Sequence, residues 1–259
     1  MFIVVAVAPF FYIVSTALKT NASLFSYPPE WIPRHPTLRN FTSAFDHGLL
    51  RWTLNSVFVS LAVAAVKVVL DSMSAYALSK MRFFGRRPLM VLMFGTLLVP
   101  IGVLIIPLYF IVRDLGLLNT YWALLLPPLA NPIGIFILQG HMAVLPRDLE
   151  HAARLDGCGP WRTYCFVILP LVKPGLVVVG IYTFLVQYIN FTWPLVAANT
   201  DQLRTLTTGL ASLNTQVQAF QGWGLISATA LLAMVPITIV FVVFQRQFMS
   251  ASIAAAIKE

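Results

Sequence analysis

The chain has 259 residues, of which 59% are hydrophobic and only 10% are charged, and its mean hydropathy is +0.83. Because a soluble domain is usually about half apolar, this composition excludes a soluble protein and indicates a polytopic membrane protein. The formal net charge of +8 does not indicate nucleic-acid binding, since the basic residues lie mainly at the ends of apolar runs, where such residues set membrane topology.

Long apolar runs define the predicted fold. A membrane-spanning helix needs about 20 mostly apolar residues. Runs of about this kind cover residues 2–18, 53–79, 88–112, 121–140, 175–198 and 223–245. We therefore predict an all-α transmembrane fold of six spans that forms a single domain over residues 1–259.

The first run, within residues 1–18, has two interpretations. It could be a secretory signal cleaved after "AVA" at 6–8, but no basic segment precedes it, as one would in such a signal. We therefore expect a first transmembrane helix, with a cytoplasmic leader before it.

The distribution of basic residues predicts the orientation in the membrane. If the N-terminus is cytoplasmic, the inside segments hold ten basic residues and the outside segments hold six. The inside set is Lys80, Arg82, Arg86, Arg87, Arg147, Arg154, Arg162, Lys173, Arg246 and Lys258; the outside set is Lys19, Arg34, Arg39, Arg51, Arg113 and Arg204. The cluster "KMRFFGRR" at 80–87 is the strongest signal, and both termini are predicted to be cytoplasmic.

The second run, 53–79, carries two charged residues, Lys67 and Asp71, one helical turn apart. An unpaired charge at the bilayer centre costs at least about 2.5–3.5 kcal/mol. We therefore expect the two side chains to form an ion pair that faces the helix bundle. An ion relay or a contact with solute is the alternative role for this pair.

Prolines interrupt most of the later runs, at Pro100, Pro107, Pro127, Pro128, Pro132, Pro194 and Pro236. Such breaks are tolerated in a membrane where neighbouring helices or a cavity satisfy the freed backbone groups. They predict helices that line a pathway and move, with simple packing kinks as the alternative.

Two segments, 27–45 and 202–224, are predicted to be external, and the second could contact a soluble partner, a neutral polar solute or only solvent.

The segment "LPRDLEHAARLDG" at 145–157 is polar and has the signals of a short helix. Pro146 suits a first turn, two acidic residues follow it, and Gly157 can adopt the left-handed conformation that ends a helix. Leu149, Ala152 and Ala153 share a face, which predicts a docking helix of small apolar side chains. A second short helix is predicted at about 159–168. Because thiols stay reduced in the cytoplasm, Cys158 and Cys165 are expected to be packing residues, with neither a disulfide nor a metal site.

The string "EHAARLDGCGPWRTYCFVILPL" resembles the EAA motif of ABC importer permeases, and Glu150, Ala152, Ala153, Asp156, Gly157, Ile168, Leu169 and Pro170 match it. The stretches 55–65, 74–87, 99–127, 145–157 and 205–210 are similar to the MalG-like permeases of carbohydrate-uptake importers. This resemblance implies the type I ABC importer fold, a bacterial inner-membrane location and a cytoplasmic coupling segment at 145–170. In it, Glu150, Ala152, Ala153, Arg154, Asp156 and Gly157 would serve coupling to an ATPase, with Glu150 and Arg154 as the charges that contact the partner.

The same resemblance implies a second permease subunit, an ATPase dimer and an extracytoplasmic solute-binding protein as partners. The sequence has no G-x-x-x-x-G-K-[ST] phosphate loop, so we expect this chain to be a non-catalytic subunit that binds no cofactor or metal, while the ATPase subunits use ATP and Mg²⁺. The tail "FMSASIAAAIKE" at 248–259 departs from the family pattern, because Ala251 and Ala255 replace two glycines.

The fifth run contains the candidate solute path: Gln187, Tyr188, Asn190 and Trp193 combine hydrogen-bonding and aromatic groups, as a sugar site requires. On one continuous helix Gln187 and Asn190 would share a face, whereas Tyr188 and Trp193 would lie toward other faces. Here the family usually has W-N-x-F, and this chain places Ile189 at the tryptophan position.

The family resemblance, with which these residue patterns agree, implies an importer permease for a sugar or oligosaccharide. The nearest alternative is the same machinery carrying glycerol phosphate or a glycerophosphodiester. A secondary transporter that works without an ATPase is a more distant alternative, since no inverted repeat is evident. A membrane enzyme is weaker still, because no nucleophile motif, paired carboxylates or metal-ligand spacing occurs in the membrane segments.

Overall fold

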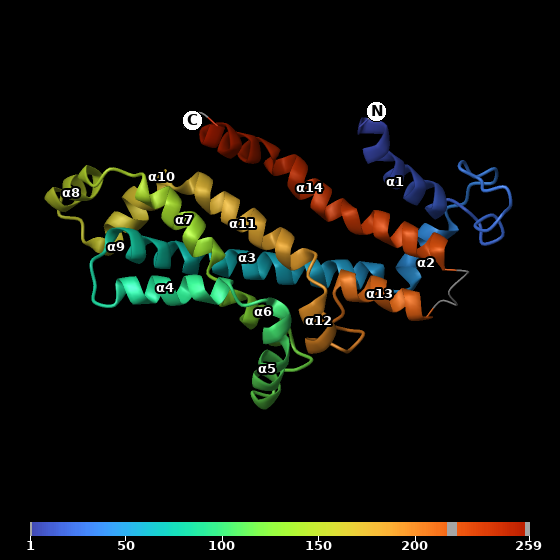
Figure 1. The fold of residues 1–259 in the computed structure, drawn as a ribbon, viewed down its shortest axis with the longest axis horizontal. Helices are drawn as coiled ribbons and strands as arrows, with labels where there is room; N and C mark the ends of the chain where they lie inside the picture. The colour runs from blue at the N-terminus through green and yellow to red at the C-terminus, as the bar shows by residue number, and fades with distance from the viewer. Residues whose placement is uncertain (1, 217–221, 257–259) are drawn as a thin grey trace. The chain divides into compact units, whose positions relative to one another are not determined.

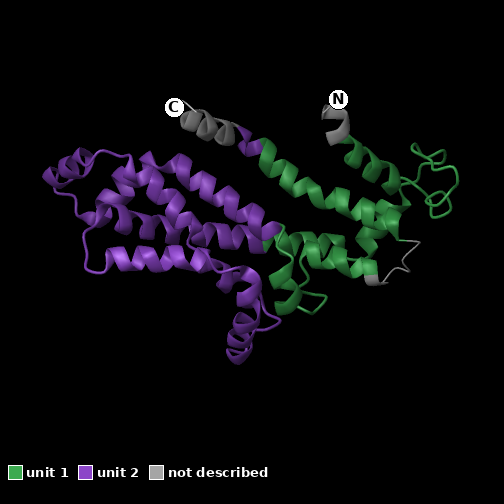
Figure 2. Ribbon diagram, in the orientation of Figure 1, with its two compact units in different colours: residues 1–58, 189–242 green, residues 59–188, 243–259 purple. Residues whose placement is uncertain are grey.

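The computed structural model describes residues 2–216 and 222–256, and the side chains of 7–214 and 222–245. Within these ranges the chain is helical, with no strand (Figure 1). It divides into two compact units (Figure 2): residues 1–58 with 189–242 form unit 1, and residues 59–188 with 243–259 form unit 2. Two long helices, α3 (Leu49–Lys80) and α14 (Trp223–Ala256), contribute to both units.

Unit 1 holds α1 (Phe2–Ala17), α2 (Arg39–Asp46), α12 (Thr192–Ala197), α13 (Leu206–Gln216) and the adjoining parts of α3 and α14. Asn40 of α2 donates two hydrogen bonds of 2.8 Å to the carbonyls of Ala17 and Lys19, which satisfies acceptors at the end of α1. The predicted external segment 27–45 is therefore tied by hydrogen bonds to the first helix.

The start of α13 packs against α3 within unit 1. Ser56 accepts a 2.8 Å hydrogen bond from the backbone N–H of Leu206, and Gly209 lies where a Cβ would collide with the Trp52 ring. The first half of the polar segment 202–224 is therefore packed, with Leu206 and Leu213 buried, and is not an ordinary solvated loop. Residues 217–221 of this segment lie outside the described residues.

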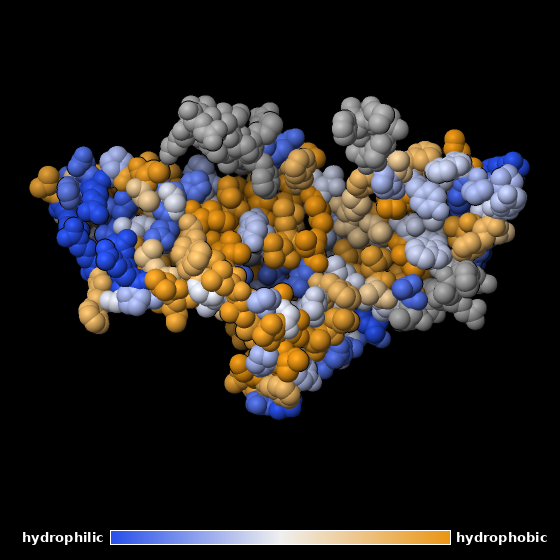
Figure 3. All heavy atoms as spheres, viewed as in Figure 1, coloured by the Kyte–Doolittle hydropathy of each residue, from blue (hydrophilic) through white to orange (hydrophobic). Residues whose placement is uncertain are grey.

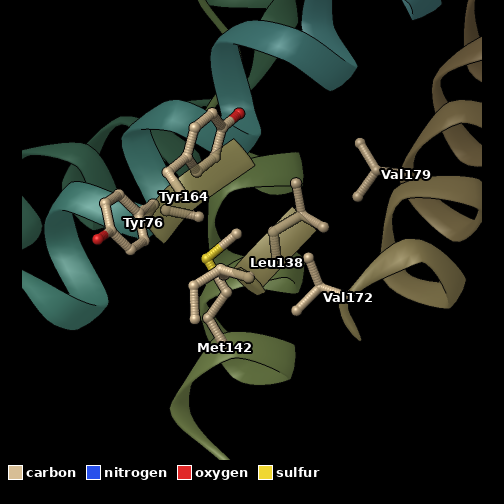
Figure 4. Close-up of a cluster of buried hydrophobic side chains, with 8 residues drawn as sticks. Tyr76, Leu138, Met142, Tyr164, Val172 and Val179 are labelled. Carbon is tan, nitrogen blue, oxygen red and sulfur yellow. The ribbon is translucent and has the colours of Figure 1, made fainter. Parts of the chain in front are cut away.

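Unit 2 holds the remainder of α3 and a series of shorter helices. They are α4 (Arg86–Leu97), α5 (Ile101–Asp114), α6 (Tyr121–Leu129), α7 (Ile133–Ala143), α8 (Asp148–Leu155), α9 (Pro160–Thr163), the π-helix η1 (Tyr164–Ile168), α10 (Leu169–Leu171) and α11 (Lys173–Tyr188). Figure 4 shows its core, with Tyr76 and Tyr164 on one side of Leu138 and with Val172 and Val179 on the other. This core joins α3 and α7 to the segment that runs from η1 to α11.

The helices agree with the predicted apolar runs to different degrees. Helices α3 and α14 are each long and apolar enough to cross a membrane, and the apolar part of α1 (Val7–Ala17) is a shorter helix. The run 88–112 is not one helix, because α4 and α5 meet at 103° and Pro100 lies immediately before α5. The run 121–140 likewise bends by 42° between α6 and α7, and Pro132 lies immediately before α7.

The prediction for the fifth span was wrong in its limits. Helix α11 ends at Tyr188, and the chain continues through a break into α12 instead of remaining helical to 198. On the N-terminal side, the helical segment 160–171 meets α11 at 78°, and only the two together are long and apolar enough for a broken span. Proline does not always break these helices, since Pro107 and Pro236 lie inside α5 and α14.

Candidate functional site

The EAA segment forms α8, a helix of eight residues that begins at Asp148, so Pro146 lies before the helix and not in its first turn as predicted. Asp148 and Glu150 lie in the first turn and Arg154 in the last, where each charge complements the helix dipole. Gly157 has a φ of 79°, and Cys158 N–H donates a 2.8 Å hydrogen bond to the carbonyl of Ala153. This is the left-handed C-terminal motif predicted from Gly157, which satisfies the last carbonyls of the helix.

The face of α8 that points outward differs from the predicted one. Ala153 and Glu150 are buried, whereas Ala152 is exposed and Leu155, at 89%, is almost fully exposed. We expected Leu149, Ala152 and Ala153 to form the docking face. Of these three, only Ala152 is exposed, so the outward face of α8 is rotated relative to the predicted one. The exposed stripe consists of Asp148, His151, Ala152 and Leu155, with Arg154 and Asp156 also exposed.

Glu150 is not a free surface charge, contrary to our expectation. Its Oε1 lies 3.3 Å from Nζ of Lys80, the last residue of α3, and both side chains are almost completely buried. Lys80 also donates a 2.8 Å hydrogen bond to the carbonyl of Leu145, just before α8. One lysine thus holds both the start and the inner face of the coupling segment against the end of α3.

No local sequence pattern predicts this contact. Lys80 lies 70 positions before Glu150, in the basic cluster that we interpreted only as a topology signal. Removing one partner of a buried ion pair leaves an uncompensated charge, so the contact constrains where α8 can lie relative to α3.

A second link to α3 comes from η1. The Tyr164 and Ser72 hydroxyls are 2.7 Å apart, and the rings of Tyr76 and Tyr164 pack with centroids 5.2 Å apart. The predicted helix at 159–168 is confirmed as α9 followed by a π-helical turn, a local widening that often occurs at functional sites. Both halves of the EAA segment therefore contact the same helix.

Lys67 and Asp71, the two charged residues of the second apolar run, form the predicted ion pair. Nζ of Lys67 lies 3.0 Å from Oδ2 of Asp71, and both side chains are buried. Lys67 also donates a hydrogen bond to the carbonyl of Asn131, in the break between α6 and α7. Gly134 of α7 lies so close to the Asp71 carboxylate that it has no room for a Cβ. The pair thereby fastens the broken span to α3.

The candidate solute-path residues do not lie on one helix. Gln187 and Tyr188 end α11, Asn190 lies in the break, and Trp193 belongs to α12. The shared face of Gln187 and Asn190, on which the prediction depended, is therefore absent. Tyr188 and Trp193 are buried, and the Asn190 carbonyl accepts a 2.7 Å hydrogen bond from Thr207 of α13.

No group of three or more His, Cys, Asp or Glu side chains that could hold a metal ion occurs among the described residues. Hydrophilic residues gather over α8 and α9, whereas the surface of α5 is mainly apolar (Figure 3). In this arrangement a short helix with an exposed face is joined by buried polar contacts to a long apolar helix.

Comparisons with known proteins agree with this geometry. The model of a family described as "binding-protein-dependent transport system inner membrane component" matches residues 68–251. An arabinooligosaccharides transport system permease protein from Halalkalibacterium halodurans is 33% identical over 246 residues, covering 94% of this chain and 86% of that protein. An sn-glycerol-3-phosphate transport system permease protein from Brucella abortus is 30% identical over 254 residues, covering 95% of this chain and 90% of that protein.

A third relative, a diacetylchitobiose uptake system permease protein from Streptomyces coelicolor, is 33% identical over 248 residues and covers 94% of this chain and 82% of its own. The fold is similar to that in a crystal structure of a bacterial ABC transporter involved in the import of the acidic polysaccharide alginate. The TM-score is 0.85 at 22% identity, with 95% of this chain and 91% of that chain covered.

Proposed function

Because the chain belongs to the family of binding-protein-dependent transport system inner membrane components, we propose that it couples ATP hydrolysis by a partner to solute movement across the membrane. In this proposal it is one of two permease subunits of an importer that also contains an ATPase dimer and an extracytoplasmic binding protein. The observation that carries the proposal is the buried Lys80–Glu150 ion pair, which joins α8 to the end of α3.

The exposed stripe of α8 is proposed to sit in a cleft of the ATPase subunit. Closure of the ATPase dimer on ATP would displace α8, and the ion pair and the Tyr164–Ser72 contact would transmit the displacement to α3. Helix α3 is continuous over 32 residues, so it can act as a lever across the membrane. Such rigid-body motion of packed helices is a common form of alternating access.

Under this proposal ATP and Mg²⁺ bind to the ATPase subunits, and this chain supplies the path and the coupling. Both termini lie in the cytoplasm of a bacterium, as the basic residues predict. A secondary transporter would leave the exposed stripe of α8 without a partner, which makes that alternative weaker.

The proposed solute is a sugar or oligosaccharide. Two of the relatives described above carry arabinooligosaccharides or diacetylchitobiose in their names, while a third names sn-glycerol 3-phosphate. An anionic solute would favour a cation in the path, but Lys67 is neutralised by Asp71 and also bound to the Asn131 carbonyl. The buried pair therefore favours a neutral solute over glycerol phosphate or a glycerophosphodiester.

The test is uptake and ATP hydrolysis in proteoliposomes that contain this chain with the subunits encoded beside it. Leu155→Asp places a charge on the exposed stripe of α8, where it should cost little folding free energy but weaken docking to the ATPase. Leu115→Asp is the matched control, because Leu115 is also exposed, at 65%, and follows α5 on the predicted external side.

We expect Leu155→Asp to lose co-purification of the ATPase and solute-stimulated hydrolysis, while Leu115→Asp retains both. A panel of oligosaccharides, glycerol phosphate and glycerophosphodiesters identifies the solute. Solute uptake by the chain alone, with both variants active as wild type, would refute the proposal.

A further inference from the structure

A polar cavity of about 530 Å³ lies in unit 2 beside the coupling helix. It is lined by the end of α3, the turn that leads into α4, the start of α4, and the helices α8 and α9. Its charged lining consists of five basic residues and one carboxylate: Lys80, Arg82, Arg86, Arg147, Arg154 and Glu150. From this set, the coupling function described above uses the Lys80–Glu150 pair, and the family resemblance also gives Arg154 a contact with the ATPase; Arg82, Arg86 and Arg147 have no assigned role.

The charges of the cavity are strongly unbalanced. Glu150 is already bound to Lys80, which leaves four arginines, and none of them forms an ion pair with a residue in the described part of the chain. Like charges gathered around one space repel each other unless an anion joins them. Arginine guanidinium groups bind phosphate oxygens, as they do carboxylate oxygens, through paired hydrogen bonds, so this lining is suited to a phosphate group.

The turn between α3 and α4 indicates where that phosphate comes from. Met81, Phe83 and Phe84 are exposed at 42%, 43% and 105%, directly beside the cavity-lining Arg82 and Arg86. Exposed apolar side chains interspersed with arginines are suited to a segment at the level of the lipid headgroups, where the rings reach the acyl chains and the cations reach the phosphates. A soluble anion would not need these apolar neighbours.

We propose that this cavity binds the phosphate of an anionic phospholipid from the cytoplasmic leaflet. The cationic lining receives the headgroup, and Phe83 and Phe84 lie along its acyl chains. Basic pockets on the cytoplasmic side of membrane helices are suited to such headgroups. Since the cavity is lined by α3, α4 and α8 residues together, the bound lipid would hold the turn at 81–85 against the coupling helix.

The experiment measures lipid binding to the full chain, purified in detergent with its partner subunits. Short-chain phosphatidylglycerol is titrated and compared with short-chain phosphatidylcholine, glycerol phosphate and inorganic phosphate. Arg82→Gln/Arg147→Gln removes two charges from the cavity. Arg87→Gln/Arg162→Gln is the matched control, because it removes two charges from the same segments but neither residue lines the cavity.

We expect the wild type to bind phosphatidylglycerol at least about tenfold more tightly than phosphatidylcholine, and the cavity variant to lose about tenfold in affinity. The control variant should stay within about twofold of wild type. This headgroup comparison in the wild type does not depend on the folding of any variant, nor on whether the complex transports a sugar.

Three results would overturn the proposal. Equal losses in the two variants would mean non-specific attraction to a basic surface. Displacement of phosphatidylglycerol by equal concentrations of inorganic phosphate would mean a site for a free anion. Loss of the ATPase subunit from the cavity variant, with unchanged lipid affinity, would assign the arginines to an acidic protein segment.

Discussion

Helix α3 carries two buried lysine–carboxylate ion pairs, one within the helix itself and one with another helix. Lys67 pairs with Asp71 one turn later on the same helix, whereas Lys80, about 20 Å further along, pairs with Glu150 of α8. Each lysine also donates a hydrogen bond to a backbone carbonyl in a neighbouring connection, Asn131 for the first and Leu145 for the second. The first lysine stabilises the break between α6 and α7, and the second holds α8 on α3.

This difference teaches how a buried charge can be used in a membrane protein. The Lys67–Asp71 pair is local, so its two charges neutralise each other wherever the other helices lie. The Lys80–Glu150 pair exists only when α8 is docked on α3, because its two charges come from different helices. The second pair is therefore suited to transmitting motion, whereas the first is suited to stabilising a fixed arrangement.

The largest expected effect comes from breaking the long-range pair. Lys80→Ala leaves Glu150 buried without a cation, and we expect a loss of about 3–5 kcal/mol in the free energy of unfolding. Lys80→Met/Glu150→Leu removes both charges and should recover most of that stability. It should also lower the amount of solute moved per ATP hydrolysed, because the link between α8 and α3 is weakened.

Denaturant titration in mixed micelles measures the stability, and proteoliposomes measure the ratio of transport to hydrolysis. Lys67→Met/Asp71→Leu is the matched comparison, in which we expect a near-normal ratio. If this local double variant uncouples transport as strongly as the long-range one, the distinction between the two pairs is wrong.

A substitution at Gly134 disturbs the Lys67–Asp71 pair by steric contact and leaves both charged residues in place. A Cβ at Gly134 would collide with the Asp71 carboxylate and come within 2.9 Å of Val179, so Gly134→Ala should cost about 1–3 kcal/mol by overpacking. Gly140 lies on the same helix with no atom within 4 Å of a Cβ, so Gly140→Ala should be neutral or slightly stabilising. Melting temperatures of the two purified variants compare them directly, and equal values would contradict the close packing of α7 on Asp71.

The same comparison explains what could be predicted from the sequence. The Lys67–Asp71 pair follows from a spacing of four residues and the cost of charge in a membrane, and the end of α8 follows from Gly157. Both signals are local. Hydropathy likewise located the long helices α3 and α14.

The remaining features depend on tertiary structure. Glu150 looked like an ordinary surface charge, because nothing within its own helix reveals that Lys80 covers it. Periodicity placed Asn190 on the face of Gln187 by assuming an unbroken helix, yet the chain leaves α11 at Tyr188. Pro100 and Pro236 look alike in sequence, but the chain bends by 103° just before α5 and stays helical through α14. In each case packing between segments that are distant in the sequence decides whether a side chain is buried or where a helix ends or bends.

The smallest expected effect concerns the uncharged link between α3 and the EAA segment. Tyr164→Phe removes a buried 2.7 Å hydrogen bond to Ser72, which should cost about 0.5–1.5 kcal/mol and leave the ring packing on Tyr76 intact. Tyr182→Phe, on the more exposed surface of α11, is the control and should have no measurable effect. Because Lys80 still holds α8, solute transport per ATP should remain close to wild type in both variants. A Tyr164→Phe protein that unfolds normally but hydrolyses ATP without transport would instead make η1, and not the ion pair, the main connection between the coupling segment and α3.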